Sequence, residues 1–246
     1  RYTMSQAVAD GITVPIKYHP RIARVLLDNA MVAKIEKYYS ACAKMGSSEE
    51  DVKASMNAMS SMEVILSDPE RLDRLAVDIH DHFTKSIDED TERPQKAMIA
   101  CCNRQIAYTL LKKFEAHYPE WFEERKKPDG LTATEEEMAE LKEMPTIAMV
   151  SSVGKNDPAE MYNYLGGAAN DVRRTRLEAE FKQDKSNLRI VIVVDMWITG
   201  FDVPCLTYLY NDKPLQRHLL IQTISRVNRK YPGKEFGLIV DYIGIR

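Results

Sequence analysis

The sequence predicts an α/β fold, in which a parallel sheet is flanked by helices and preceded by a mainly helical N-terminal segment. From residue 97 onward, short apolar runs typical of strands alternate with helix-like amphipathic stretches. One such run, 188–194, is a nearly continuous Val/Ile run, as a strand buried on both faces requires. Alternation of strands and helices is the pattern of a parallel sheet covered on both faces.

The first 90 or so residues begin with an extended segment and then read as helical. Residues 11–19 alternate β-branched and polar side chains, and Pro15 places them at a sheet edge or in a crossing linker. Helices are then predicted over 31–42, 48–62 and 68–83. Asp68 and Pro69 form a typical helix start. The polar run 88–94 is typical of a boundary between two parts of the chain.

Beyond this boundary, predicted strands alternate with predicted helices. Strands are expected over 97–102, 146–150, 188–194, 206–210 and 236–243. Helices are expected over 106–114, 134–142, 159–181 and 218–229, and a turn over 126–130. Gly166 and Gly167 predict a break within the third of these helices. The order is that of an α/β parallel sheet.

Composition limits the classes of protein to which the chain can belong. Its 246 residues suffice for one large domain or two small ones. A net charge of −3 gives no global signature of nucleic-acid binding, so such binding must come from a local basic groove. The four cysteines lack the paired spacing of a zinc site, and reduced thiols in the cytoplasm are the simplest account. No apolar run reaches membrane-spanning length, so we expect no membrane contact.

A basic cluster near the C-terminal end is the strongest functional signal. Arg226 and Arg229 are three residues apart and share one face of the predicted helix, with Gln222 one turn earlier on the same face. Guanidinium groups match phosphate oxygens geometrically, so the cluster suits a nucleotide triphosphate. The alternative is an ordinary basic helix face exposed to solvent.

A second signal lies about twenty residues earlier, in the segment 195–202. In parallel sheets, ligands collect at the carboxyl ends of the strands, and this segment follows the strand predicted over 188–194. Gly200 allows close backbone approach, Thr199 offers a hydroxyl to a phosphate, and Asp202 could accept from a ribose hydroxyl or orient an arginine. A strand-to-helix turn without function is the alternative, because Thr, Gly and Asp are common there.

Together these two segments resemble a known family. The Thr-Gly-Phe-Asp-x-Pro run from Thr199 and the Gln-x-x-x-Arg-x-x-Arg run from Gln222 are similar to motifs V and VI of superfamily-two helicases and translocases. The wider run from 190 to the C-terminal end resembles the restriction (R) subunit of type I restriction-modification enzymes. The resemblance is strong over the last 60 residues and weak over 20–90.

This resemblance implies a division of the chain. Residues 1–25 would be the linker from a missing first motor lobe, 26–90 a helical segment, and 91–246 the second RecA-like lobe of a helicase or translocase. The chain starts at Arg1 rather than Met and stops directly after an apolar, strand-like run. We therefore expect it to be a piece of a longer polypeptide.

The resemblance also implies roles at an ATP site shared between two lobes. Arg226 and Arg229 would reach the γ-phosphate and stabilise charge developing in phosphoryl transfer, with Arg229 as the arginine finger proper. Gln222 would help to sense the nucleotide, and Gly200 and Asp202 would line the cleft. ATP and Mg²⁺ would both be held mainly by the missing first lobe.

On the DNA side, the resemblance implies contacts that do not read sequence. Thr199 would touch a backbone phosphate, and Asn103 and Arg104 match the place of motif IV, where such lobes grip one strand. Phosphate contacts position the duplex without reading its bases, which suits a motor that walks over any DNA.

Several features of a complete enzyme are missing from the sequence. There is no GxxxxGK[ST] loop, because Gly154-Lys155 and Gly233-Lys234 are followed by Asn and Glu. Residues 128–142 mimic a nuclease signature, but in a turn and a charged helix. Asp78 and His82 stand one turn apart without a third convincing metal ligand, so we expect no metal site in this chain. We therefore expect the chain alone to hydrolyse ATP poorly and to contribute to a type I site-specific deoxyribonuclease only within its parent.

The partners that the resemblance implies are duplex DNA, the methylation and specificity subunits, and the first RecA-like lobe of the same parent chain. Two alternatives stay open. One is the second lobe of another superfamily-two helicase acting on DNA or RNA. The other is a non-catalytic RecA-like binding module.

Overall fold

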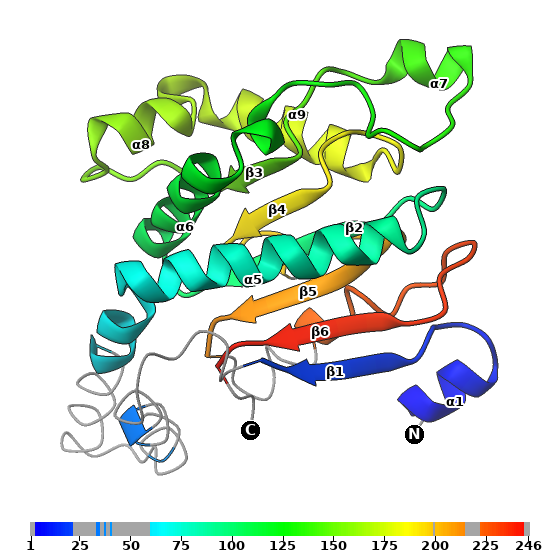
Figure 1. Ribbon diagram of the computed structural model, residues 1–246, viewed down its shortest axis with the longest axis horizontal. Coiled ribbons are helices and arrows are strands. Elements are labelled where there is room, and N and C mark those ends of the chain that lie inside the picture. The colour runs from blue at the N-terminus through cyan, green and yellow to red at the C-terminus, as the bar shows by residue number, and fades with distance from the viewer. Residues whose placement is uncertain are drawn as a thin grey trace.

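The computed structural model describes residues 3–21, 60–198, 200–214 and 222–243, together with the isolated residues 33, 34, 37 and 40. In these residues one parallel sheet has the strand order β1-β6-β5-β2-β4-β3 (Figure 1). The strands are β1 (Ile16–Pro20), β2 (Lys96–Cys101), β3 (Ile147–Val150), β4 (Ile190–Val193), β5 (Leu206–Asp212) and β6 (Gly237–Asp241). Every neighbouring pair is parallel, which confirms the predicted fold class.

Each predicted strand is present, because each apolar run is buried on both of its faces. Side chains that alternate along β2 belong to two different cores: Ala97 and Ile99 face one, and Met98 and Ala100 face the other. The segment with Pro15 leads into β1, which lies at the edge of the sheet and pairs only with β6 among the described strands. An edge position is where Pro is tolerated, because one side of the strand needs no donor.

Helices cover both faces of the sheet. The helical elements are α1 (Met4–Ala9), α5 (Pro69–Asp88), α6 (Arg104–His117), η1 (Pro119–Phe122), α7 (Glu135–Glu140), α8 (Ala159–Tyr164), η2 (Gly167–Ala169) and α9 (Asn170–Lys182). Buried side chains of α5 and α6 pack on one face, in front of the sheet in Figure 1. Buried side chains of α9 and of the segment 197–206 pack on the other face.

Local sequence signals account for the helix boundaries. The side chain of Asp68 caps α5 by accepting from the backbone N–H of Arg71 at 2.9 Å, with Pro69 in the first turn. The predicted break after α8 is also present. Gly166 has φ 93°, a left-handed conformation that glycine adopts without strain, and a short 3-10 turn follows before α9.

Two elements extend the folded unit beyond the lobe predicted over 91–246. Strand β1 belongs to the same sheet, and α5 packs in the same hydrophobic core as β2. Helix α1, which the sequence analysis did not predict although Thr3 and Gln6 form a capping box at its start, precedes β1. The helices predicted over 31–42 and the first part of 48–62 lie outside the described residues, apart from four isolated helical ones; residues 60–66 are helical. No described helix is long and apolar enough to cross a membrane.

Candidate functional site

The loop between β4 and β5 carries the first group of predicted site residues. Asp195 lies two residues after β4, at the carboxyl edge of the sheet, where the ammonium of Lys213 pairs with it and also donates to the carbonyl of Val194. The loop then crosses the α9 face of the sheet to the amino end of β5. Thus only the start of the segment 195–202 lies at the carboxyl edge, which corrects the prediction for Asp202.

Aromatic stacking fixes this loop against the sheet. The rings of Trp197 and Phe201 are parallel within 2° with centroids 4.3 Å apart, and Phe181 of α9 stacks on both. Trp197 has φ 64°, a conformation that side chains rarely adopt. Gly200 has φ 72°, and nothing lies within 4 Å of the position where a Cβ would stand. Gly200 is therefore required by its backbone conformation, and it leaves the space above it open.

Arg226 is held directly on this loop. One terminal nitrogen of its guanidinium donates to the carbonyl of Phe201 at 2.6 Å, and the other donates to the Ser225 hydroxyl at 3.0 Å. Its Nε donates to the carbonyl of Gln222 at 3.3 Å. Burial and the nearby positive charge of Arg229 lower the pKa of Arg226. Its guanidinium is thus positioned by backbone and hydroxyl oxygens, without a carboxylate partner among the ion pairs of the described residues.

Arg229 reaches the neighbouring residue of the same loop. Its Nε lies 3.2 Å from a carboxylate oxygen of Asp202, with 49% and 57% of the two side chains exposed. Each arginine therefore contacts the segment 201–202, Arg226 through a carbonyl and Arg229 through a carboxylate. Two basic side chains from one segment therefore meet one loop.

The route by which the arginines meet the loop differs from the prediction. Of the helix predicted over 218–229, residues 215–221 lie outside the described residues, and only 222–224 are helical in the described part. Arg226 lies in a turn, and Arg229 forms an antiparallel bridge with Thr13. The backbone N–H of Val14 donates to the carbonyl of Asn228 at 2.9 Å. The helix ends early because the segment leading into β1 pairs with the chain at this point.

The predicted DNA-binding residues lie elsewhere. Asn103 follows β2 at the carboxyl edge of the sheet and caps α6, accepting from the N–H of Ile106 at 2.9 Å. Arg104 pairs with Asp157, whose other oxygen accepts from the N–H of Gly154 at 2.7 Å. Within the described part of the chain, the contacts of Asn103 and Arg104 and those of Arg226 and Arg229 involve different residues. Thr199 lies outside the described residues.

Lys234, which follows Gly233 in one of the two Gly-Lys pairs of the sequence, has a structural role. The ammonium of Lys234 donates to the carbonyls of Pro204 at 3.0 Å and Leu206 at 2.5 Å, and burial lowers its pKa to about 8. It therefore ties the segment after Arg229 to the start of β5. No group of three or more His, Cys, Asp or Glu in the described part of the chain could hold a metal ion.

Sequence reasoning missed the contacts that hold the two arginines in place. The carbonyl of Phe201 and the bridge from Thr13 are backbone groups, which carry no side-chain signal. The stacking of Trp197 on Phe201 had a weak signal, since two aromatic residues flank the Gly200 turn at a spacing of four.

Comparison with known proteins decides the family. The family model for Type I restriction enzyme subunit R domain 3 matches residues 7–244. The chain belongs to this family. Over 252 residues it is 33% identical to the type I restriction enzyme HindI endonuclease subunit of Haemophilus influenzae, covering 99% of this chain and 20% of that protein.

Two further similarities involve a short stretch of a relative and a solved structure. A stretch of 58 residues is 52% identical to a type I restriction enzyme endonuclease subunit of Staphylococcus aureus. It covers 23% of this chain and 6% of that protein. A solved structure of the type ISP restriction-modification enzyme LlaBIII bound to DNA is also similar. It shares 13% identity at a TM-score of 0.46, over 95% of this chain and 12% of that one. The chain spans 20–23% of the length of the curated relatives that match 99–100% of it.

Proposed function

We propose that this R-subunit domain supplies the arginine half of an ATP site in a two-lobed, DNA-translocating motor. One observation carries the proposal: Arg226 and Arg229 both contact the loop 200–203, one through the carbonyl of Phe201 and one through Asp202. The two guanidinium groups contact adjacent residues of one loop. Two guanidinium groups placed in this way can bind phosphate oxygens together.

The two arginines are prepared for different tasks. Arg226 is anchored by the backbone and by Ser225, so it positions the loop and presents a fixed positive charge. Arg229 is half exposed, and among the described residues its carboxylate partner is Asp202, which is also about half exposed. Exposed ion pairs contribute only about 0–1 kcal/mol, so a nucleotide phosphate displaces Asp202 at little cost. Arg229 is therefore the arginine finger of the proposal, and Asp202 its partner when no nucleotide is bound.

The remainder of the proposed ATP site belongs to another part of the parent protein. The sequence has no phosphate-binding GxxxxGK[ST] loop, so the β- and γ-phosphates and Mg²⁺ would be held by a first RecA-like lobe. When bound, Mg²⁺ neutralises charge on the phosphates. Gln222, next to the Arg226 side chain, and Gly200 would face the nucleotide across the cleft. We expect the domain alone to turn over ATP poorly.

Duplex DNA would run along residues at the carboxyl edge of the sheet. Asn103 and Arg104 are the proposed backbone contacts there, and Arg104 would exchange Asp157 for a DNA phosphate. Thr199 is a further proposed phosphate contact, from the resemblance of its motif alone. The methylation and specificity subunits would assemble on other parts of the parent in the cytoplasm, and cleavage would occur there too. These contacts read no base, so target choice would come from another subunit.

The test is ATP turnover by the full-length R subunit, comparing wild type with Arg229→Ala. Arginine fingers contribute about 10³–10⁵ in rate, so we expect duplex-stimulated turnover to fall at least about a thousandfold. Arg74→Ala is the matched control, because it removes an equally exposed, ion-paired arginine of α5. Turnover unchanged in Arg229→Ala would exclude the arginine-finger role. Stimulation by single strands or RNA alone would favour another superfamily-two helicase, and no stimulated turnover in wild type would favour a binding module.

A further inference from the structure

A buried lysine lies behind the candidate site, at the amino end of β2. Lys96 is the first residue of this strand and is fully buried. Its ammonium donates to three backbone carbonyls, those of Glu180 at 3.3 Å, Phe181 at 2.8 Å and Leu188 at 3.0 Å. The first two belong to the last turn of α9, where helix carbonyls lack donors within the helix and the helix dipole favours a cation. Lys96 therefore caps α9 from the interior of the protein.

This cap needs the charged form of Lys96. An ammonium has three N–H groups, one for each carbonyl, whereas a neutral amine has two and would turn a lone pair toward the third carbonyl. Burial lowers the pKa of Lys96 to about 8, and Arg189 adds to this shift. Cys205, Asp184 and Glu180 oppose it. The cap is therefore complete at pH 7 and loses one donor as pH rises through about 8.

Phe181 connects this cap to the loop that holds Arg226. Its ring stacks on the rings of Trp197 and Phe201, with centroids 5.9 and 6.1 Å apart. The ammonium of Lys96 lies 4.8 Å from the centre of the same ring. The carbonyl of Phe201 in turn accepts from the guanidinium of Arg226 at 2.6 Å. The stack and one peptide group therefore join the capped end of α9 to this arginine.

The other end of the loop is held independently. The ammonium of Lys234 donates to the carbonyls of Pro204 and Leu206, on either side of Cys205. The carbonyl of Cys205 accepts from the backbone N–H of Lys96 at 3.3 Å. Because this segment is held by its own hydrogen bonds, the part of the loop whose position depends on the α9 cap is the part that carries the stacked rings.

We propose that Lys96 is a positioning residue of the ATP site, a role that rests on the proposed function of the two arginines. By capping α9 it fixes the stack of Phe181 on Phe201, and through the carbonyl of Phe201 it fixes the guanidinium of Arg226. Lys96 is fully buried, so its effect on turnover is indirect. A misplacement of about 1 Å can cost about a hundredfold in rate, so a cap outside the site still affects turnover.

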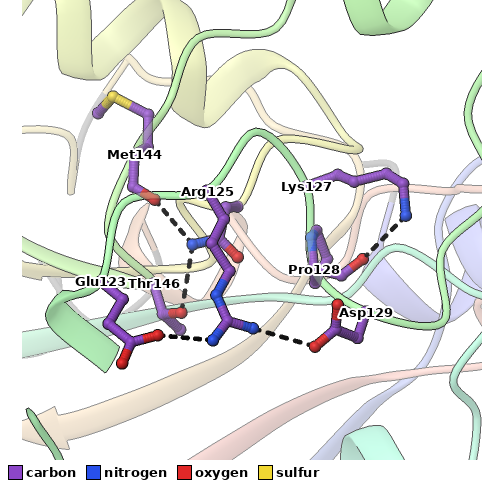
Figure 2. Close-up of polar contacts among 8 residues, drawn as sticks. Glu123, Arg125, Lys127, Pro128, Asp129, Met144 and Thr146 are labelled. Carbon is purple, nitrogen blue, oxygen red and sulfur yellow. Dashed lines mark hydrogen bonds and ion pairs between the residues drawn. The ribbon is translucent and has the colours of Figure 1, made fainter. Parts of the chain in front are cut away.

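Duplex-stimulated ATP turnover by the full-length R subunit at pH 7 tests this role. Lys96→Met keeps a long, unbranched side chain and removes the three donors, and we expect it to lower kcat by about tenfold to a hundredfold. Lys127→Met is the matched control and should leave turnover unchanged. The ammonium of Lys127 also donates to a backbone carbonyl, that of Pro128, in a turn outside the loop (Figure 2). Normal turnover in folded Lys96→Met would overturn the proposal.

A double-mutant cycle separates positioning from a general loss of stability. If Lys96 acts through Arg226, then Lys96→Met should lower turnover little further in an Arg226→Ala background. Losses that multiply would show that Lys96 supports the fold alone, and would overturn the proposal.

Two further variants keep the outcomes distinguishable. Phe181→Leu removes the stacking ring and leaves the cap, so it tests the same route if Lys96→Met does not fold. It should lower kcat by at least about tenfold, again with little further loss in the Arg226→Ala background, and normal turnover would overturn the proposal. Arg229→Ala is measured beside it. Unchanged turnover in Arg229→Ala would contradict the proposed function, whereas its loss there with normal turnover in Lys96→Met would contradict only the role of Lys96.

Discussion

Two arginine–carboxylate pairs in this domain have the same chemistry and different surroundings. Arg71 of α5 and Asp212 at the end of β5 form two hydrogen bonds, at 2.5 and 3.2 Å, and both side chains are fully buried. Arg229 and Asp202 touch through one contact, and each is about half exposed. Burial makes the first pair part of the fold, since neither partner can be released into water. Exposure leaves the second pair exchangeable, which a transient phosphate contact requires.

The largest expected effect comes from breaking the buried pair. Arg71→Ala leaves the Asp212 carboxylate buried without its partner, and burial already raises the pKa of that group against the opposing effect of Arg71. We expect a loss of about 3–5 kcal/mol in the free energy of unfolding, measured with urea. Arg74→Ala, three residues along the same helix in an exposed pair, should cost less than about 0.5 kcal/mol. Equal losses in the two variants would contradict the distinction by burial.

The second expected effect is a dependence of stability on pH through His82, which joins α5 to Tyr210 of β5. Burial, followed by the charges of Arg21 and His19, lowers the pKa of His82 to about 4 from its ordinary value of 6.5. The unfolded chain therefore takes up a proton at His82 before the folded chain does as pH falls. Stability from this group is complete above pH 6.5 and is lost between 6.5 and 4.

The measurement is urea unfolding at pH 7.5 and at pH 4.5. After allowance for the solvated part of the ring, we expect His82 to account for about 1–2 kcal/mol of the loss. His82→Gln removes the titration and can still pair with the hydroxyl of Tyr210, 2.8 Å from the His82 ring. If the variant loses as much stability as wild type over this range, another group is responsible.

The smallest expected effect belongs to the exposed pair. Arg229→Ala should change the free energy of unfolding by less than about 0.5 kcal/mol, because an exposed pair contributes little. Urea unfolding of the 246-residue chain measures this change. A loss above about 2 kcal/mol would show that the bridge between Thr13 and Arg229 depends on the side chain, and would make Arg229 a structural residue.

The fold was largely predictable because its signals are local. The apolar runs, the cap at Asp68 and the glycine break at Gly166 each depend on a few consecutive residues, and each is present as predicted. Interactions between distant segments were not predictable. Arg71 and Asp212 are 141 residues apart, and no property of either residue indicates the other.

The candidate site divides in the same way. Residue type and spacing predicted roles for Arg226, Arg229 and Asp202, and the structure brings the two arginines to the loop that contains Asp202. The spacing predicted both arginines on one helix, whereas the segment beside Thr13 ends that helix and pairs with residue 229.

The central claim is that Arg229 acts on ATP and not on stability. The most direct test measures both ATP turnover and unfolding in one variant. Arg229→Ala is made in the full-length R subunit for duplex-stimulated ATP turnover and in the 246-residue chain for unfolding. The account predicts at least about a thousandfold loss of turnover with the unfolding free energy unchanged within about 0.5 kcal/mol. Normal turnover, or a loss of turnover accompanied by a comparable loss of stability, would contradict the assignment of Arg229 to the ATP site.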